Sequence, residues 1–341
     1  MSTNIDTVAA PSDLPSGKRV LSGTQPTGYL HLGNYFGAIR QYIAFQEAND
    51  CAYFIADYHS MTAIRDAEQR RALVKHVAMA FLALGVDPKQ SILYRQSDLP
   101  EVHELTWMLT TLTPMGLLER AHSYKDKIAQ GVKAEHGLFA YPVLMAADIL
   151  IHSADFVPVG QDQKQHLEMA RDIAVKFNLA YEEVFTLPEP YILKDVAVVP
   201  GVDGQKMSKS YDNTVQIFEA TKALKKQIMR IQTDSTPVED PKDPELPVFQ
   251  LFNLFANAEE REQMAARARQ GGLGYGDVKK AIFEKLQEYF EPAIERYRDL
   301  EAHPDTLEDI LRDGATRARE SVAPLMARVR SAAGIGGERA G

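Results

Sequence analysis

The first half of the chain alternates short apolar runs with longer amphipathic stretches, and this alternation constrains the fold more than any other feature. Apolar runs at residues 18–23, 51–56, 91–96 and 156–160 are typical of buried strands. Apolar residues spaced three and four apart predict helices over residues 35–46, 66–84 and 161–177. Strands that alternate with helices form parallel sheets through crossover connections. We therefore predict an α/β fold with a parallel sheet.

The strand signal fades after about residue 212, and the rest of the sequence is predicted to be helical. A chain of 341 residues is long enough for two domains. We predict a flexible tail at residues 1–16, an α/β domain at 17–211 with an insertion at about 97–140, and a helical domain at 212–335. The last helix of that domain could pack back on the α/β domain. The expected helices cover residues 215–232, 248–256, 259–269, 277–303 and 315–333.

Composition removes several classes of protein. The single cysteine, Cys51, excludes an intrachain disulfide framework, a cysteine-based zinc site and an iron–sulfur cluster held by protein thiols alone. No metal site built from protein side chains is expected. No apolar run reaches the length of about 18 residues that a membrane span needs, and the N-terminus lacks a signal-peptide pattern, so we expect a cytoplasmic protein. The net charge of −9 argues against nucleic-acid binding unless basic residues gather locally.

A turn rich in Gly, Thr and Pro follows the first predicted strand and leads into a helix that starts near Gly33. In a parallel sheet the first such turn is a common ligand site, and a helix start offers free N–H groups to an anion. His31 and Asn34 add neutral donors, and Gly33 has no side chain to block close approach. The segment indicates a phosphate site. A structural turn with a capping His31 explains it equally well when it is taken alone.

A second candidate phosphate element lies at residues 206–210, which read Lys-Met-Ser-Lys-Ser after a turn with Gly201 and Gly204. Two lysines three residues apart on a glycine-flanked loop could clamp a polyphosphate, because each ammonium acts as a compact point charge. Such a clamp could stabilise the charge that develops on a leaving pyrophosphate. Taken alone, the string is better explained as a solvent-exposed basic loop.

Together the two motifs resemble a known family. His31, Leu32, Gly33 and Asn34 resemble the HIGH signature of class I aminoacyl-tRNA synthetases, and residues 206–210 match the KMSKS signature letter for letter. Asn34 replaces the second histidine, a departure that is common among the tryptophan enzymes. Residues 25–28, 144–150, 157–166 and 274–276 further resemble the bacterial tryptophanyl-tRNA synthetases, and the similarity extends over residues 18–335.

The resemblance implies a Rossmann-type catalytic domain followed by an all-helical anticodon-binding domain. The implied reaction has two steps: ATP activates L-tryptophan to tryptophanyl-adenylate with release of pyrophosphate, and the acyl group then moves to the 3′-terminal adenosine of tRNA(Trp). Mg²⁺ is expected to travel with ATP. A homodimer is also implied, with an interface in the insertion that contains Trp107. The anticodon is expected to meet a local basic surface made of Lys222, Lys225, Lys226, Arg230, Arg261, Arg267 and Arg269.

The resemblance also assigns site residues. Lys206, Lys209 and Gln25 are the expected catalytic residues. ATP is expected to contact Gln25, Pro26, Thr27, His31, Gly33, Asn34, Gly160, Gln161, Asp162, Val198, Lys206, Met207, Ser208, Lys209 and Ser210. Tryptophan is expected to contact Asp148, Tyr141, Met145, Gln163, Leu21, Gly23, Val157 and Val159.

Asp148 is the residue that the resemblance pairs with the indole N–H. It lies within the apolar run at residues 144–150, where a buried carboxylate needs a hydrogen-bond donor. An indole N–H is a donor-only partner. From the run alone, a helix-capping or salt-bridged aspartate is the stronger interpretation, and Met145, Val157 and Val159 could be ordinary core residues.

Three other functions stay open at this point. A tyrosine–tRNA ligase could use Asp148 to accept a phenol, although the contexts at residues 144–150 and 157–166 argue against it. A small nucleotidyltransferase shares a similar histidine-containing corner, but the helical second domain and the intact lysine motif argue against it. A synthetase paralogue that binds a partner without charging tRNA would keep both motifs.

Overall fold

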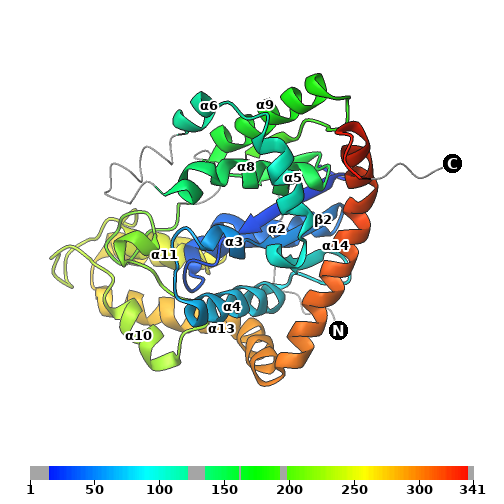
Figure 1. Cartoon of the computed structure of the whole chain (residues 1–341). Helices are drawn as coiled ribbons and strands as arrows, with labels where there is room; N and C mark the ends of the chain where they lie inside the picture. Colours follow the sequence, from blue (N-terminus) through cyan, green and yellow to red (C-terminus); the bar gives the residue numbers. More distant parts are fainter. Residues whose placement is uncertain (1–14, 122–134, 161–162, 193–197, 337–341) are drawn as a thin grey trace.

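The computed structural model describes residues 15–121, 135–160, 163–192 and 198–336, and its centre is a parallel sheet (Figure 1). Each paired strand runs parallel to its neighbour, in the order β3-β2-β1-β4-β5. The predicted α/β fold with a parallel sheet is therefore confirmed. The strands are β1 (Arg19–Thr24), β2 (Asp50–Ile55), β3 (Ile92–Arg95), β4 (Phe156–Val159) and β5 (Glu189–Ile192).

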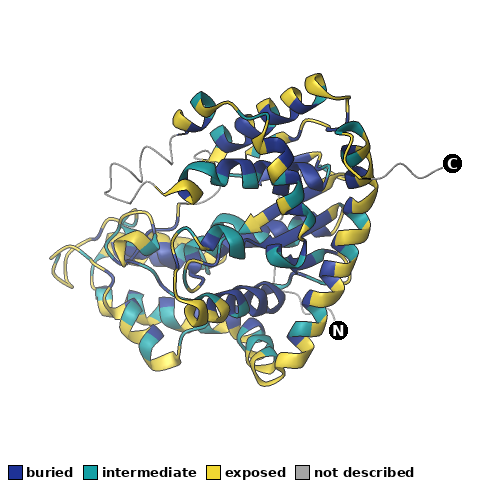
Figure 2. Cartoon of the chain, in the orientation of Figure 1, coloured by how far each residue is buried: buried dark blue, intermediate teal, exposed yellow. Residues whose placement is uncertain are grey.

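Alternating side chains divide the core into two layers, one on each face of the sheet. In β1, Val20 belongs to the first layer and Leu21 to the second, and in β2 Tyr53 and Phe54 divide in the same way. This follows from the pleat of a strand, in which successive side chains point to opposite faces. Most of β2 and the middle of β1 are buried, whereas β5 is half-buried to exposed, and the exposed residues of the molecule gather on the outer sides of the helices (Figure 2).

The helix after β1 and helix α4 (Ala67–Leu84) contribute to the first layer. α4 begins as predicted, because the Asp66 side chain accepts a hydrogen bond from the Gln69 N–H at 2.6 Å. It ends at Gly85, whose φ of 120° lies in the region that favours glycine. The helix after β1 is continuous but changes its winding, from α1 (Leu32–Asn34) through a π-helical turn η1 (Tyr35–Ile39) to α2 (Arg40–Gln46).

The second layer is covered by helices that follow β3 and β4. α8 packs against α5 and α9, and the three helices lie together above the sheet in Figure 1. Short turns at the strand ends complete this half of the molecule. These elements are α3 (Asp57–Ser60), η2 (Gln96–Asp98), α5 (Glu101–Thr110), α6 (Met115–Glu119), α8 (His136–Ile151) and α9 (Lys164–Ala180).

The C-terminal part of the chain is helical, as predicted. The first layer of the core continues from Val20 of the sheet into Ile282 and Phe290 of the long helix α13, which packs along α4. Residues on both sides of position 212 share this core, so the predicted domain boundary at that position stays a prediction. The helices are α10 (Thr221–Met229), α11 (Pro247–Asn253), α12 (Ala258–Gln270), α13 (Tyr275–Ala302) and α14 (Pro304–Ala332).

α14 returns to the sheet and lies along β3 (Figure 1). A Cβ atom at Gly314 would lie 1.9 Å from the carbonyl oxygen of Leu93, so only glycine permits this approach. Arg317 donates to the carbonyl oxygen of Ser91 at 2.7 Å. The last helix of the chain therefore packs on the first half of the sequence.

Three elements differ from the predicted ones. The helix expected from residue 215 begins only at Thr221, because residues before it form backbone hydrogen bonds with the turn after β1. The helix expected from residue 315 begins at Pro304, since proline suits the first turn of a helix. β5 was not predicted, because its four residues, which include Pro190, lack a periodic apolar pattern.

Candidate active site

A cavity of about 440 Å³ lies at the carboxyl ends of β1 and β4. The helix after β1 packs in the first core layer and α9 in the second, so the two connections leave the sheet in opposite directions. Parallel α/β sheets bind ligands at this kind of switch point. Gln25 and Gly160, predicted for ATP, line the cavity. So do seven of the eight residues predicted for tryptophan: Leu21, Gly23, Tyr141, Met145, Val157, Val159 and Gln163.

One end of the cavity carries a chain of polar side chains. The Tyr141 hydroxyl lies 2.8 Å from Nε2 of His166, and Nδ1 of the same ring lies 3.0 Å from Oε1 of Gln163. An amide oxygen can only accept, so Nδ1 of His166 donates to Gln163, and in the tautomer with its proton on Nδ1 the Nε2 atom accepts from Tyr141. Sequence analysis predicted Tyr141 and Gln163 but missed His166, which joins them.

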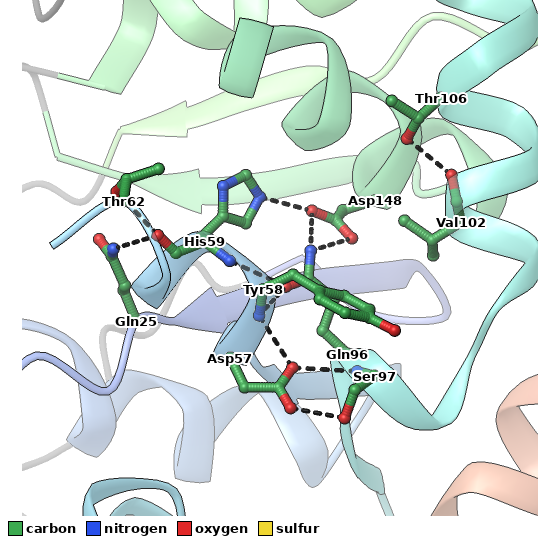
Figure 3. A network of polar contacts seen from close by, with 10 residues as sticks. All are labelled: Gln25, Asp57, Tyr58, His59, Thr62, Gln96, Ser97, Val102, Thr106 and Asp148. Atoms are coloured by element: carbon green, nitrogen blue, oxygen red, sulfur yellow. Dashed lines mark hydrogen bonds and ion pairs between the residues drawn. The ribbon is translucent and has the colours of Figure 1, made fainter. Parts of the chain in front are cut away.

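Asp148, the eighth residue, lies beside the cavity, and its side chain is 1% exposed. The Gln96 amide donates to both carboxylate oxygens at 2.9 and 2.8 Å, and Nε2 of His59 lies 2.9 Å from Oδ2 (Figure 3). His59 lines the cavity, so its ring links the cavity wall to the carboxylate. Burial, with the charge of Asp148 as a further cause, raises the pKa of Tyr94 well above its usual value. Asp148 therefore has the donors that a buried carboxylate requires.

The lysine loop lies directly on the turn that follows β1, although the two are far apart in the sequence. Nζ of Lys209 donates to the carbonyl oxygen of Gly28 at 2.9 Å, across 181 positions of the chain. The Gly33 N–H donates to Sδ of Met207 at 3.4 Å. A Cβ atom at Gly28 would lie 3.0 Å from the Lys209 side chain, so glycine leaves room for it. The two predicted phosphate elements thus converge.

The electrostatics of this corner suit an anion. Burial lowers the pKa of Lys209 to about 8, so its ammonium is mostly charged at pH 7. Burial, followed by the nearby charge of Lys209, lowers the pKa of His31 to about 4 and keeps its ring neutral. Asn34 accepts a hydrogen bond from the His31 N–H at 3.1 Å. The corner combines one half-buried cation with neutral groups at a helix start.

Hydrogen bonds fix both sides of the lysine loop. Oδ1 of Asn213 accepts from the Ser208 N–H at 2.7 Å, and its Nδ2 donates to the carbonyl oxygen of Lys206 at 3.1 Å. The carbonyl oxygen of Val215 accepts from the Leu32 N–H at 3.0 Å. Asn213 itself is 1% exposed, so its side chain is fixed inside the protein while the loop that it holds reaches the surface. The loop is held by a residue that the sequence motif does not include.

A histidine connects the same corner to the C-terminal helices. The Leu30 N–H donates to Nε2 of His76 at 2.9 Å, which leaves Nδ1 as the donor to the Tyr297 hydroxyl at 2.7 Å. Burial and the charge of Lys209 lower the pKa of His76 to about 4. A neutral imidazole therefore links the turn after β1 to α13.

For the remaining residues predicted to contact ATP, the structure gives their exposure to solvent. Lys206, Ser210 and Thr27 are exposed, and Val198 is 66% exposed. Pro26 is buried and Ser208 is half-buried. Gln161 and Asp162 lie outside the described residues. Their contacts with ATP stay predictions.

Sequence analysis missed the polar residues that support the predicted ones: His59, Gln96, His166 and Asn213. His59, Gln96 and Asn213 lie outside the recognised motifs. His166 lies within residues 157–166 but had no assigned role. Gln96 had one available signal, because it directly follows β3 at the carboxyl end of the sheet, where functional side chains collect.

Within the described ranges, no group of three or more His, Cys, Asp or Glu side chains could hold a metal ion. The same ranges contain no helix that is both long and apolar enough to cross a membrane.

A family model for the class I tRNA synthetases of tryptophan and tyrosine matches residues 16–291. The chain belongs to this family. The synthetase is 56% identical over 318 residues to the tryptophan–tRNA ligase of Rhodopirellula baltica. The alignment covers 93% of this chain and 99% of that protein. The crystal structure of Campylobacter jejuni tryptophanyl-tRNA synthetase complexed with ADP and tryptophan has a TM-score of 0.90 and 51% identity, and covers 93% of this chain and all of that one.

Synthetases for the other amino acid of the family share the fold at lower identity. The tyrosyl-tRNA synthetase of Archaeoglobus fulgidus has a TM-score of 0.60 and 20% identity over 82% of this chain. These comparisons confirm the resemblance to class I aminoacyl-tRNA synthetases that the HIGH-like and KMSKS motifs indicated.

Proposed function

We propose that this chain is a tryptophan–tRNA ligase, which activates L-tryptophan with ATP and transfers it to tRNA(Trp). The observation that carries the proposal is the contact between the two phosphate elements, Lys209 on Gly28, in a turn that also lines the cavity through Gln25. A volume of about 440 Å³ falls in the range of small-molecule sites, roughly 300–1,000 Å³. The relatives named as tryptophan–tRNA ligases support this choice of amino acid.

Activation requires a carboxylate and a triphosphate to meet in line. A tryptophan carboxylate oxygen attacks the α-phosphorus, the bond to the bridging oxygen of the β-phosphate breaks, and pyrophosphate leaves with the electron pair. We assign Lys206 and Lys209 to the negative charge that grows on the leaving group. Gln25 would orient the reactants, whereas the N–H groups of Leu32, Gly33 and Asn34 already donate within the chain. No side chain forms a covalent bond, so the catalytic effect comes from positioning and charge stabilisation.

Tryptophan recognition is assigned to the two polar ends of the cavity. The indole N–H would pair with Asp148, either at Oδ1 or in place of the His59 N–H at Oδ2. The α-amino group would donate to the acceptors offered by Tyr141 and Gln163. Apolar walls from Leu21, Gly23, Met145, Val157 and Val159 would contact the ring.

Mg²⁺ is assigned to the nucleotide and not to a protein site. The described corner presents Lys209, His31 and Asn34, whereas Mg²⁺ prefers carboxylates and phosphate oxygens. ATP would therefore bring the ion with it.

Contacts beyond the cavity are assigned to tRNA and to a second copy of the chain. Lys222, Lys225, Lys226 and Arg230 are exposed on and directly after α10, and we assign this face to the anticodon region of tRNA. For the homodimer we assign the surface around α5 and α6, where Trp107 is 69% exposed and Met115 is 63% exposed.

Amino-acid-dependent exchange between ATP and pyrophosphate tests the proposal, followed by charging of total tRNA. Exchange with tryptophan and little with tyrosine, together with charging of tRNA(Trp), is the expected result. Exchange that prefers tyrosine would support the tyrosine alternative. Exchange without charging would support a paralogue with another partner, and no exchange with any amino acid would reject the assignment.

A further inference from the structure

We propose that Gln96 is a positioning residue that fixes the Asp148 carboxylate and thereby sets the preference for an aromatic ring that carries an N–H group. The inference rests on the proposed role of Asp148 in tryptophan binding. Among the described residues, the cavity wall includes His59 and Met145 but not Gln96, so Gln96 would act through the carboxylate and not through the substrate.

Gln96 uses both ends of its amide. It is 0% exposed and is the first residue after β3. Its nitrogen donates to both oxygens of Asp148, at 2.9 and 2.8 Å. Its oxygen accepts from the N–H groups of Tyr58 and His59, at 3.1 and 3.4 Å (Figure 3). Gln96 therefore joins α3 to the C-terminal end of α8.

Only one orientation of this amide satisfies its neighbours. A flipped amide would place its oxygen against the Asp148 carboxylate and its nitrogen against the N–H groups of Tyr58 and His59. Acceptor would then face acceptor and donor would face donor, in a site closed to water. The Gln96 nitrogen is thus fixed toward the carboxylate.

The two-oxygen contact limits how the Asp148 carboxylate can turn. A carboxylate offers about four acceptor sites. Among the described residues, Gln96 makes one hydrogen bond to each carboxylate oxygen of Asp148, and His59 makes a further contact at Oδ2. Oδ1 therefore has one contact fewer than Oδ2 and keeps capacity for a further donor. A ring N–H can donate a hydrogen bond to this oxygen. A ring with sulfur in the same place cannot donate, and it would face a buried negative charge without a hydrogen bond.

The backbone that carries Gln96 is itself held by a second carboxylate. Oδ1 of Asp57 accepts from the Ser97 N–H at 3.0 Å, and Oδ2 accepts from the Ser97 hydroxyl at 2.5 Å. Burial is the main influence on Asp57 and raises its pKa, while these hydrogen bonds act in the opposite direction. The position of Gln96 is therefore set from its neighbour as well as from its own side chain.

The test compares tryptophan with its benzothiophene isostere, which has sulfur in place of the ring N–H. The kcat/KM for each is measured by pyrophosphate exchange in the wild type, Gln96→Met and Asp148→Ala. Methionine nearly conserves the volume of glutamine but removes both ends of the amide. The matched control is Gln46→Met, because Gln46 is also buried and bonds Gly85 at 2.8 Å, in a network without Asp148.

We expect Gln96→Met to lower the preference for tryptophan over the isostere about tenfold or more, through a raised KM for tryptophan. The KM for ATP and the rate with the isostere should change little, and Gln46→Met should keep the wild-type preference. A purely structural role would lower the melting temperature of both variants without changing the ratio.

The possible failures are distinguishable. An unchanged ratio in Gln96→Met with a lowered ratio in Asp148→Ala overturns the inference and leaves the proposed function intact. An unchanged ratio in Asp148→Ala, which has no acceptor left, overturns the indole assignment and this inference with it. If Gln96→Met does not fold, Gln96→Asn, whose amide is too short to span both partners, is judged by the same ratio.

Discussion

Raising the pH should weaken the lysine loop, because burial lowers the pKa of Lys209 to about 8. With that pKa, the ammonium is about 90% protonated at pH 7 and about 10% protonated at pH 9. Only the protonated form can stabilise charge on a leaving pyrophosphate. Since the pKa of this cation is lowered, its contribution is present below pH 8 and is lost as the pH rises. The kcat/KM for ATP reports groups of the enzyme form that binds ATP, and it should fall about tenfold for each unit above pH 8.

The assay is tryptophan-dependent pyrophosphate exchange from pH 6.5 to 9.5 at constant ionic strength and saturating tryptophan. Lys209→Arg should give a lower but flat profile, because a guanidinium keeps its proton throughout this range. Lys206→Arg is the matched control, since Lys206 is exposed on the same loop, and it should keep the wild-type fall. The amino group of tryptophan titrates alike in all three proteins, so their comparison isolates Lys209.

Two results would refute this reasoning. A wild-type profile that stays flat to pH 9.5 would mean that Lys209 keeps its proton or takes no part in activation. The same fall in Lys209→Arg as in the wild type would assign the titration to another group.

Three further predictions concern the pocket, the loop and the fold. Asp148→Ala should raise the KM for tryptophan by about 100-fold and leave the KM for ATP nearly unchanged in the exchange assay; an equal loss of both would contradict the pocket assignment. Asn213→Ala should raise the KM for ATP and lower the free energy of unfolding by about 1–3 kcal/mol, measured by urea titration, with tryptophan affinity intact. Gly314→Ala should lower the free energy of unfolding by at least about 2 kcal/mol, because its Cβ would lie 1.9 Å from the carbonyl oxygen of Leu93. Its control, Gly276→Ala, meets nothing within 4 Å and should raise that free energy by up to about 1 kcal/mol; similar shifts in both variants would argue against the close approach.

The sheet and the two phosphate elements, the turn after β1 and residues 206–210, could be predicted because their sequence signals are local. β1 and β2 are apolar runs that end in turns, and α4 carries both a capping residue, Asp66, and a terminating Gly85. The two phosphate motifs lie on short stretches of sequence, so their residue types and order were enough to indicate their chemistry. Their contact through Lys209 and Gly28 was implied only by the family resemblance.

The rest depends on contacts between distant parts of the chain. Ile217 belongs to an apolar pattern with helical spacing, yet its N–H donates to the carbonyl oxygen of Leu30 at 3.3 Å and keeps the segment extended. Gln96 and His59 gain their roles only when β3 and α3 bring them to Asp148 on α8. No spacing in the sequence encodes that meeting, because the elements that create it come from separate crossover units.

The position of α14 along β3 has a consequence for synthesis of the chain on the ribosome. β3 is an edge strand, and the residues that cover it, such as Gly314 and Arg317, are translated more than 200 positions later. Nascent chains therefore carry an open sheet edge until the last helix has emerged, and open edges favour pairing with other chains. A chain that stops before Pro304 should consequently aggregate during expression even though all five strands are present.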